Sequence, residues 1–240
     1  MKASLFTLLT CAAIYPVSTP AFASDAQHPT VVELFQSQGC SSTPPANANL
    51  IELSKRPDIL ALSFAVTYWD QLGWKDTFDS PQYTERQWDY AHALHHSQVW
   101  TPQMIVNGRA DSVGSDKTEI EALMARADRG ASGPTVAITP TTVSVGAADA
   151  PGKTADVWLV RYEPRVVPVA ILRGENGGRT LPYKNVVHEL RKLGVWTGRP
   201  QSYAVPLAGN QDFATAVLVQ AGSGTPLPLR LSAWSKTSGI

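Results

Sequence analysis

The chain has 240 residues, of which 43% are hydrophobic and 17% are charged, with 20 Lys and Arg against 20 Asp and Glu. This composition suits one large or two small folded domains and is not that of a disordered chain. A formal net charge of +0 gives no general attraction to nucleic acid or anionic lipid. The sequence also has no basic run or zinc-finger pattern, so nucleic acid is not expected as a partner.

The first 23 residues have the pattern of an export signal. Lys2 gives the positive start, LFTLLTCAAIYPV the apolar stretch, and AFA, ending at Ala23, a small-x-small cleavage site. The apolar stretch is short and contains Pro16, which disfavours a transmembrane anchor, and a lipoprotein signal ending at Cys11 fits less well. The sequence predicts a signal peptide over 1–23, with periplasmic or secreted localisation and no membrane attachment after cleavage.

The cysteine count limits the redox chemistry of the mature chain. Cys11 is lost with the signal peptide, which leaves Cys40 as the only cysteine, so no internal disulfide can form. In an oxidising compartment such a thiol is either buried and inert or pairs with another molecule.

A βαβ unit is predicted at the start of the mature chain. TVVELF (30–35) is a short β-branched run, and PPANANLIELSKR (44–56) predicts a helix with both prolines in its first turn. DILALSFAV (58–66) has the continuous apolar character of a strand buried on both faces. Strand, helix and strand at this spacing predict two parallel strands.

A second helix is predicted over PQYTERQWDYAHALHH (81–96), with Ser80 as its cap. Its spacing predicts a buried stripe made of Tyr83, Trp88, Ala91 and Leu94.

A hairpin and a third helix follow. TPQMIVNGRADSVG (101–114) predicts a hairpin that turns at Asn107-Gly108. SDKTEIEALMARADRG (115–130) predicts a helix that is capped at Ser115 or Asp116 and ends at Gly130.

From ASGPT onward the pattern changes to short β-type runs divided by Gly, Pro and Asn turns, with one helix-like insert, NVVHELRKLG (185–194). This pattern predicts a smaller, mostly antiparallel β domain over 132–240, a sandwich or a partial barrel, after a first domain over 29–131. The runs are TVAIT, TVSVG, ADVWLVRYE, VPVAILR, SYAVPL, FATAVLVQA and PLRLSAW.

Cys40 is predicted to lie between the end of the first strand and the mouth of the first helix. Reactive groups in open α/β sheets gather at this edge, and free N–H groups at a helix start favour a thiolate. Thr43 follows three residues later, where its hydroxyl could donate a hydrogen bond to the sulfur but could not attack a disulfide. We therefore expect Cys40 to be accessible and its sulfur anionic.

Thr101-Pro102 directly precedes the predicted hairpin. A proline in this position is a candidate for a cis peptide bond, and a trans bond that opens a strand is the alternative. The cis form places the backbone of Thr101 beside Cys40, ready to pair with an extended peptide or a thiol ligand.

These features resemble a known family. VVELFQSQGCSSTPPA, YWDQLGWKDTF, TPQMIVNGR and RGENGGRTLPYKNVVHELRKLG are similar to exported, thioredoxin-like proteins of unassigned function, whose usual motif is Cys-Ser-Ser-Cys-Pro-Pro. The resemblance covers almost the whole mature chain and implies an α/β thioredoxin-like domain followed by the β domain. It gives Cys40 the place of the attacking cysteine, Thr43 that of the resolving cysteine, and Pro102 that of the cis-proline. Because Thr43 stands where the family motif has its second cysteine, dithiol exchange is not expected.

Tyr68, Trp69 and Asp70 follow the second predicted strand and are expected on the same rim as Cys40. They are interpreted as a substrate-binding wall with an acidic group. The alternative is a loop that Trp69 and Trp74 pin to the domain by packing.

Two other motifs give weaker indications of a functional site. His92, His95 and His96 have helical spacing, but no carboxylate or thiol partner is implied, so a solvated helix end is expected rather than a metal site. GENGGR lacks the context of a nucleotide loop and is interpreted as a connection with Glu175 and Arg179 along the interface between the domains. No cofactor or metal is expected.

The sequence therefore predicts single-cysteine thiol-disulfide chemistry through Cys40, which forms mixed disulfides with protein thiols, protein disulfides or small thiols. The alternative is a non-catalytic module that binds a peptide or ligand and in which Cys40 is a relic. Hydrolase motifs are absent from the sequence.

Overall fold

The computed structural model describes residues 29–128, 133–149, 154–221 and 230–231. The predicted signal peptide, 1–23, and the predicted domain boundary at 131–132 both lie outside these residues. In the described part of the chain, no helix is long and apolar enough to cross a membrane.

The fold is mixed α/β, with a large mixed sheet of eight strands in the order β11-β10-β7-β8-β2-β1-β3-β4 and a smaller antiparallel sheet in the order β5-β6-β9. The strands of the large sheet are β1 (Thr30–Gln36), β2 (Ile59–Ala65), β3 (Gln103–Val106), β4 (Ala110–Ser112), β7 (Ala155–Ala170), β8 (Thr180–Trp196), β10 (Ala214–Ala221) and β11 (Arg230–Leu231). Those of the small sheet are β5 (Val136–Ile138), β6 (Thr142–Val145) and β9 (Gln201–Ala204). Both halves of the chain thus contribute strands to the large sheet.

Local sequence signals fix the helices. These are α1 (Thr43–Leu53), the 3-10 turn η1 (Asp70–Leu72), α2 (Pro81–Ala93) and α3 (Lys117–Arg126). Ser80 and Asp116 cap α2 and α3, because each side chain accepts a backbone N–H of the first turn. The predicted βαβ unit is confirmed, since β1 and β2 pair in parallel along their whole length.

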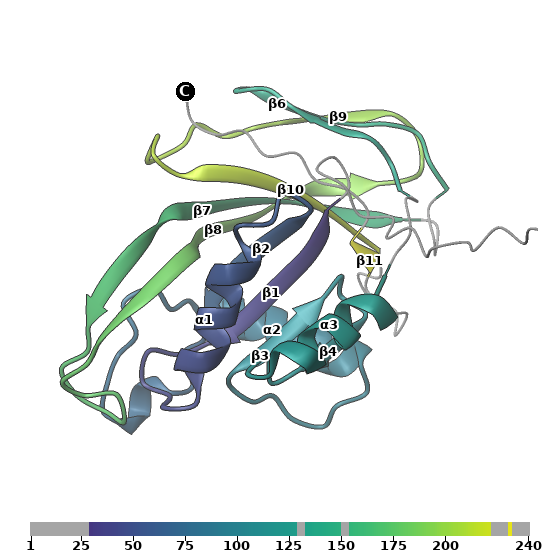
Figure 1. The fold of residues 1–240 in the computed structure, drawn as a ribbon. Coiled ribbons are helices and arrows are strands. Elements are labelled where there is room, and N and C mark those ends of the chain that lie inside the picture. The colour runs from purple at the N-terminus through teal and green to yellow at the C-terminus, as the bar shows by residue number, and fades with distance from the viewer. Residues whose placement is uncertain (1–28, 129–132, 150–153, 222–229, 232–240) are drawn as a thin grey trace, which may run out of the picture.

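Helices cover both faces of the large sheet. Figure 1 shows α1 and α3 in front of it and α2 behind it. Val32 and Leu34 of β1 pack with α1 and α3, whereas Val31 and Phe35 point to the α2 side. The small sheet packs on the β7-β8-β10 half of the large sheet. Alternate residues of each strand therefore enter different layers.

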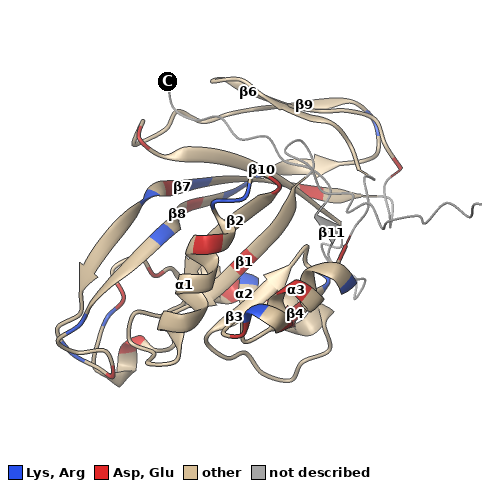
Figure 2. Cartoon of the chain, viewed as in Figure 1, with Lys and Arg blue, Asp and Glu red and all other residues tan. Residues whose placement is uncertain are grey.

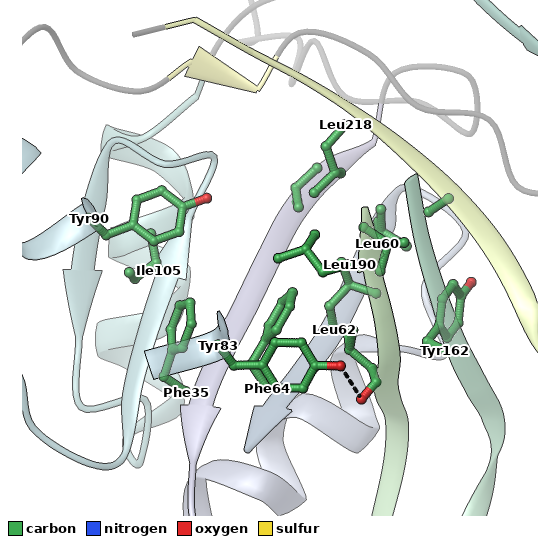
Figure 3. Packing of buried hydrophobic residues seen from close by; sticks show 14 of the residues in the cluster. Phe35, Leu60, Leu62, Phe64, Tyr83, Tyr90, Ile105, Tyr162, Leu190 and Leu218 are labelled. Carbon is green, nitrogen blue, oxygen red and sulfur yellow. Dashed lines mark hydrogen bonds between the residues drawn. The ribbon is translucent and has the colours of Figure 1, made fainter. Parts of the chain in front are cut away.

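Aromatic rings fill the layer beneath α2 (Figure 3). Phe35 and Phe64 stack with ring centroids 5.3 Å apart, and Tyr83 meets Phe64 edge-on at the same distance. The Tyr83 hydroxyl donates to the carbonyl oxygen of Val187 at 3.2 Å, which ties α2 to β8. The phenol is buried, yet its polar atom has a partner, as such a ring requires.

Two predictions about secondary structure are wrong. NVVHELRKLG is not a helix but part of β8, which pairs with β7 over almost the full length of both strands. This pairing satisfies the backbone and overrides the local helical pattern. The runs ADVWLVRYE and VPVAILR likewise belong to one strand, β7, rather than two.

The predicted stripe of α2 is only half right. Tyr83 and Ala91 are buried, but Trp88 is 36% exposed and Leu94 is half-buried. The buried face instead includes Arg86 and other polar residues, because their partners lie in the sheet below; these residues are Arg86, Gln87 and Tyr90.

Charged side chains of both signs are interspersed over the molecule, including along β7 and β8 (Figure 2). Several pair across neighbouring strands, such as Arg161 with Glu189 at 3.1 Å and Lys192 with Asp156 at 2.7 Å. Among the described residues, the charges along β7 and β8 are thus of both signs.

Candidate functional site

Cys40 lies between the end of β1 and the start of α1, as predicted, but its side chain is only 2% exposed. The expectation of an open thiol is therefore wrong. The sulfur donates to the carbonyl oxygen of Thr101 at 3.5 Å, and the Cys40 N–H donates to the Ser37 carbonyl. The tip of a later hairpin covers this loop, and nothing local to Cys40 in the sequence indicates it.

The Thr101-Pro102 peptide bond is cis, which confirms that prediction. The Thr101 hydroxyl lies 3.4 Å from the Phe35 carbonyl, and Gln103 pairs with Phe35 in the sheet. These contacts hold the carbonyl of Thr101 against the sulfur of Cys40.

Thr43 is the first residue of α1 and is fully buried. Its N–H donates to the Cys40 carbonyl at 3.1 Å. Its hydroxyl has no hydrogen-bond partner among the described residues, so the predicted bond from Thr43 to the sulfur is not formed.

Thr43 belongs to a group of buried neutral side chains beneath the first turns of α1, here called the α1 polar cluster. Each member has at least one buried polar atom that is without a hydrogen-bond partner in the described chain. Its members are Gln36, Thr43, Asn47, Ser63 and Tyr183.

The strands and α1 bring this cluster together. Gln36 continues the alternation of Val32 and Leu34 toward α1, and Ser63 lies opposite Leu34 on β2. Asn47 is one helical turn after Thr43 and donates to the carbonyl of the residue before Tyr183. The cluster therefore spans β1, β2, β8 and α1. Sequence reasoning missed it, because only tertiary packing places its members side by side.

Tyr183 and Tyr68 both lie within electrostatic reach of Cys40. Burial raises the pKa of Tyr183, and the charges of Asp76 and of a Cys40 thiolate raise it further. Burial raises the pKa of Tyr68 to about 12, and a Cys40 thiolate adds to that rise. Both phenols thus respond to the charge of a Cys40 thiolate, and Tyr68 was among the predicted site residues.

The contacts of the other two predicted rim residues are with the core and with their own loop. Trp69 packs against the aromatic core beneath α2. Asp70 accepts the N–H of Asp76 at 3.1 Å and lies 3.7 Å from the Lys75 ammonium. Both residues stabilise their own loop, whereas the pKa of Tyr68 responds to the charge of a Cys40 thiolate.

The tip of the β7–β8 hairpin covers the Cys40 loop. In Figure 1 this tip lies at the end of the sheet where α1 begins. Asn176 donates through Nδ2 to the carbonyls of Gln38 and Cys40, both at 2.9 Å. Glu175 accepts the N–H and the hydroxyl of Ser41 at 2.9 and 2.7 Å. Glu175 therefore meets the N-terminus of α1, and Ser41 lowers the pKa of its carboxyl.

Arg179 also belongs to this hairpin tip, and the sequence analysis placed it with Glu175 along the interface between the domains. Arg179 donates to Asn176 Oδ1 at 2.7 Å, so it supports the side chain that clamps the Cys40 loop.

Asp76 is a buried acid that sequence analysis missed. It is 1% exposed and accepts the N–H groups of Gln38 and Phe78 at 2.7 and 2.9 Å. Burial raises its pKa to about 6, and the two backbone donors only partly oppose the shift. Trp74 donates to Gln38 Oε1 at 2.9 Å and completes the support of this loop.

The three histidines near the end of α2 lie in different environments. His92 and His95 are exposed, as expected for a solvated helix end. His96 instead lies 3.1 Å from Asp111, so the expectation that no carboxylate is nearby is wrong. In the described ranges, no group of three or more His, Cys, Asp or Glu side chains is placed to hold a metal ion.

Asp111 begins a chain of hydrogen bonds that leads inward to Tyr68. Gln103 donates to Asp111 at 2.7 Å, Gln87 donates to Gln103 at 2.8 Å, and Tyr68 donates to Gln87 at 3.2 Å. Gln87 also donates to the Trp100 carbonyl, directly before Thr101. This chain fixes the position of the Tyr68 phenol.

A second buried polar site lies on the α2 side of the sheet. Arg86 forms two bonds to Glu33, at 2.7 and 3.1 Å, and a third to Gln220 at 3.0 Å. Tyr90 donates to Glu33 at 2.5 Å. Burial is the largest effect and opposes the charge of Arg86, but Glu33 and Tyr90 together outweigh it and the pKa of Arg86 is raised. The sequence signal was Glu33, the single charge within TVVELF.

The fold and this site define a mixed α/β protein with a buried cysteine, Cys40, at the edge of its sheet. A family model described as a protein of unknown function (DUF1223) matches residues 31–220, and the chain belongs to this family. No curated protein matches the chain.

Two solved structures are similar to this one. Protein AGR_C_4864 from Agrobacterium tumefaciens is 31% identical, with a TM-score of 0.74 over 88% of this chain and 94% of that chain. HBP35 of Porphyromonas gingivalis is 14% identical, with a TM-score of 0.58 over 90% of this chain and 76% of that chain. The second likeness concerns the fold alone.

Proposed function

We propose that this protein is an exported, thioredoxin-like protein that performs thiol-disulfide chemistry through Cys40 alone. The order β1, α1, β2, α2, β3, β4 and α3 supports a thioredoxin-like assignment, as does the strand order β2-β1-β3-β4. Helices on both faces and a cis-proline directly before β3 add to it.

The single observation that carries the proposal is the 3.5 Å contact between the Cys40 sulfur and the carbonyl oxygen of Thr101, at the cis peptide bond. The sulfur attacks one sulfur of a disulfide, so that a mixed disulfide forms and the other half leaves as a thiol. Thr43 cannot resolve this bond, and a second thiol from solution must release Cys40. Partners are protein thiols and disulfides or small thiols.

The second candidate is a binding module in which the sulfur does nothing. The burial of Cys40 favours it, since a cysteine that is 2% exposed does not meet large partners. In this case the surface near Thr101 and Tyr68 holds a peptide or small ligand.

Mass spectrometry of the protein purified from the periplasm without reductant tests the proposal. We expect an added mass on Cys40 that dithiothreitol removes and that Cys40→Ser lacks. A bare wild-type mass, unchanged after incubation with oxidised glutathione, contradicts thiol-disulfide chemistry. Capture of the same partner by wild type and Cys40→Ser then establishes the binding module.

A further inference from the structure

A surface cavity of about 490 Å³ lies between the loop that leads into α2 and the strand β8. Its lining comes from two segments of the chain, 77–83 and 188–191, and does not include Cys40. The rings of Phe78 and His188, with centroids 5.5 Å apart, bring the two segments into contact. The volume is within the range of sites for small molecules.

An irregularity in β8 brings an aromatic ring to this cavity. Tyr162 of β7 pairs with Val187 and Arg161 pairs with Glu189, so His188 is an extra residue on β8. A bulge of this kind re-aims a side chain, and such bulges are common beside functional sites.

The rings around His188 form an uncharged part of the site. His188 stacks on Phe213 with ring centroids 4.4 Å apart and meets Phe78 nearly at right angles. Burial lowers the pKa of His188, which keeps its ring neutral at pH 7. Flat rings of this kind suit the apolar side chain of a ligand.

The loop side of the cavity has an excess of negative charge. The side chain of Asp79 lines the cavity and is 9% exposed. The Lys75 ammonium lies 3.9 Å from Asp79 and 3.7 Å from Asp70, and its side chain is 79% exposed. Burial and then Asp70 raise the pKa of Asp79 to about 6, and Lys75 opposes this rise only in part. At pH 7 two carboxylates therefore share one exposed ammonium, which is a weak partner.

The β8 side of the cavity has the opposite excess. Glu189 lies 3.1 Å from Nε of Arg161 and 2.9 Å from Nε of Arg191, so one carboxylate faces two guanidinium groups. Arg191 contacts Glu189 through Nε, and its side chain is 56% exposed. Among the described residues, its terminal nitrogens have no other partner, and these nitrogens can donate to the carboxylate of a ligand.

The two charged sides are spaced for a molecule longer than a free amino acid. Asp79 directly follows Phe78, whereas Arg191 is three residues after His188, about 10 Å along a strand at about 3.3 Å per residue. A free amino acid carries its ammonium and carboxylate on one carbon, but each further residue of an extended peptide adds about 3.3–3.6 Å. Because the arginine side chain shortens the span, a peptide of two or three residues joins both sides.

From these observations we infer that this cavity binds a short peptide with free ends, its ammonium at Asp79 and its carboxylate at Arg191. A side chain of the peptide packs against Phe78 and His188. A ligand with a charge of one sign leaves the other side of the cavity without a partner, so a simple cation or anion fits less well. The inference goes beyond the proposed function, because the cavity does not contain Cys40 and binding involves no covalent step.

Isothermal titration calorimetry of the purified protein at pH 7 tests this inference. The probe is the tripeptide alanyl-phenylalanyl-alanine, compared with its N-acetylated form, its C-amidated form and free phenylalanine. Each blocked form should bind about tenfold more weakly or worse, because it lacks one charge-assisted hydrogen bond. Free phenylalanine should also bind more weakly, since it cannot reach both sides.

Matched variants identify the residues involved. Asp79→Asn should bind the tripeptide about tenfold more weakly, and N-acetylation should then have no further effect, because both changes remove the same pair. Arg191→Gln should do the same with respect to C-amidation. Arg165→Gln is the control, because Arg165 is 64% exposed and lies 2.7 Å from Glu163 but does not line the cavity. Arg191 is exposed, so Arg191→Gln tests the site even if Asp79→Asn fails to fold.

The outcomes are decisive for this site and independent of the thiol. The inference fails if the tripeptide does not bind at millimolar concentrations, or if the blocked peptides bind as tightly as the free one. It also fails if both cavity variants bind like wild type, since the peptide then lies elsewhere, for example near Thr101. Free phenylalanine that binds as tightly as the tripeptide overturns the assignment to peptides. Cys40→Ser should bind the tripeptide like wild type, so these results leave the proposed function of Cys40 to its own test.

Discussion

Glu33 and Gln36 lie three residues apart on β1, and their side chains enter opposite layers of the molecule. Glu33 points to the α2 side, where Arg86, Tyr90 and Gln220 complete a network of charged hydrogen bonds. Gln36 points to the α1 side, where neither end of its amide has a partner among the described residues. One sheet thus buries a satisfied ionic site on one face and an unsatisfied neutral site on the other.

The difference indicates what each site is for. A buried ion pair whose bonds are complete fixes which elements pack together, here β1, α2 and β10, and needs nothing from outside. Buried neutral groups without partners cost stability in the folded chain alone. Thr43 lies one turn from Cys40. A role of its hydroxyl in the chemistry of Cys40 would explain why the protein keeps a buried group that lowers its stability.

The largest expected effect comes from breaking the satisfied site. Arg86→Leu leaves Glu33 buried without its partner and should lower the free energy of unfolding by about 3–5 kcal/mol. Urea denaturation followed by fluorescence measures the loss. The exposed Lys55–Glu52 pair, with its atoms 2.7 Å apart, is the control, and Lys55→Ala should change little.

The double variant Glu33→Leu/Arg86→Leu sharpens this test. Removing both charges should restore part of the stability lost in Arg86→Leu, because no unpaired charge remains. Equal losses in the single and double variants would show that packing, and not charge, gives the site its stability.

Asp76, beside the Cys40 loop, should produce a smaller, pH-dependent effect. Burial raises the pKa of its carboxyl from 3.8 to about 6, so the folded state binds more protons than the unfolded state between these values. Its contribution to stability is complete below pH 3.8 and is lost as the pH rises through about 6. A shift of this size corresponds to roughly 3 kcal/mol.

Comparison with Asp76→Asn isolates this contribution. The free energy of unfolding of wild type minus that of Asp76→Asn should increase as the pH falls from 7 to 4, as measured by urea titrations at each pH. A difference that stays constant across this range would mean that Asp76 titrates alike in the folded and unfolded chains.

The part of the fold that sequence could predict depends on local signals. The βαβ unit, the caps at Ser80 and Asp116, and the turn at Asn107-Gly108 each need only neighbouring residues. The location of Cys40 and Pro102 relative to the predicted strands and helix also gave the place of the cysteine and the cis bond at Pro102.

The features that sequence analysis predicted wrongly or missed depend on long-range contacts. β8 forms because β7 pairs with it, although its own sequence has a helical pattern. Cys40 is buried because Asn176 and Glu175, distant in sequence, close over its loop. The polar cluster combines β1, β2, β8 and α1, and no single segment of the sequence shows it.

The smallest expected effect tests the unsatisfied site. Thr43→Val keeps the shape of the side chain and removes a buried hydroxyl that has no partner in the described chain. The free energy of unfolding should therefore stay within about 0.5 kcal/mol or rise by up to about 1 kcal/mol. Ser80→Ala, which removes a cap that does accept a bond, should cost about 1 kcal/mol.

Thermal and urea unfolding of the two variants gives the comparison. A loss above about 1 kcal/mol in Thr43→Val would show that the hydroxyl has a stabilising partner, and the contrast with the Glu33 site would disappear. If Thr43→Val instead keeps its stability and changes the rate at which Cys40 reacts with oxidised glutathione, the hydroxyl contributes to chemistry rather than to folding. That combination is expected for a group kept at a reactive sulfur in spite of its burial, because selection for function accepts a small loss of stability.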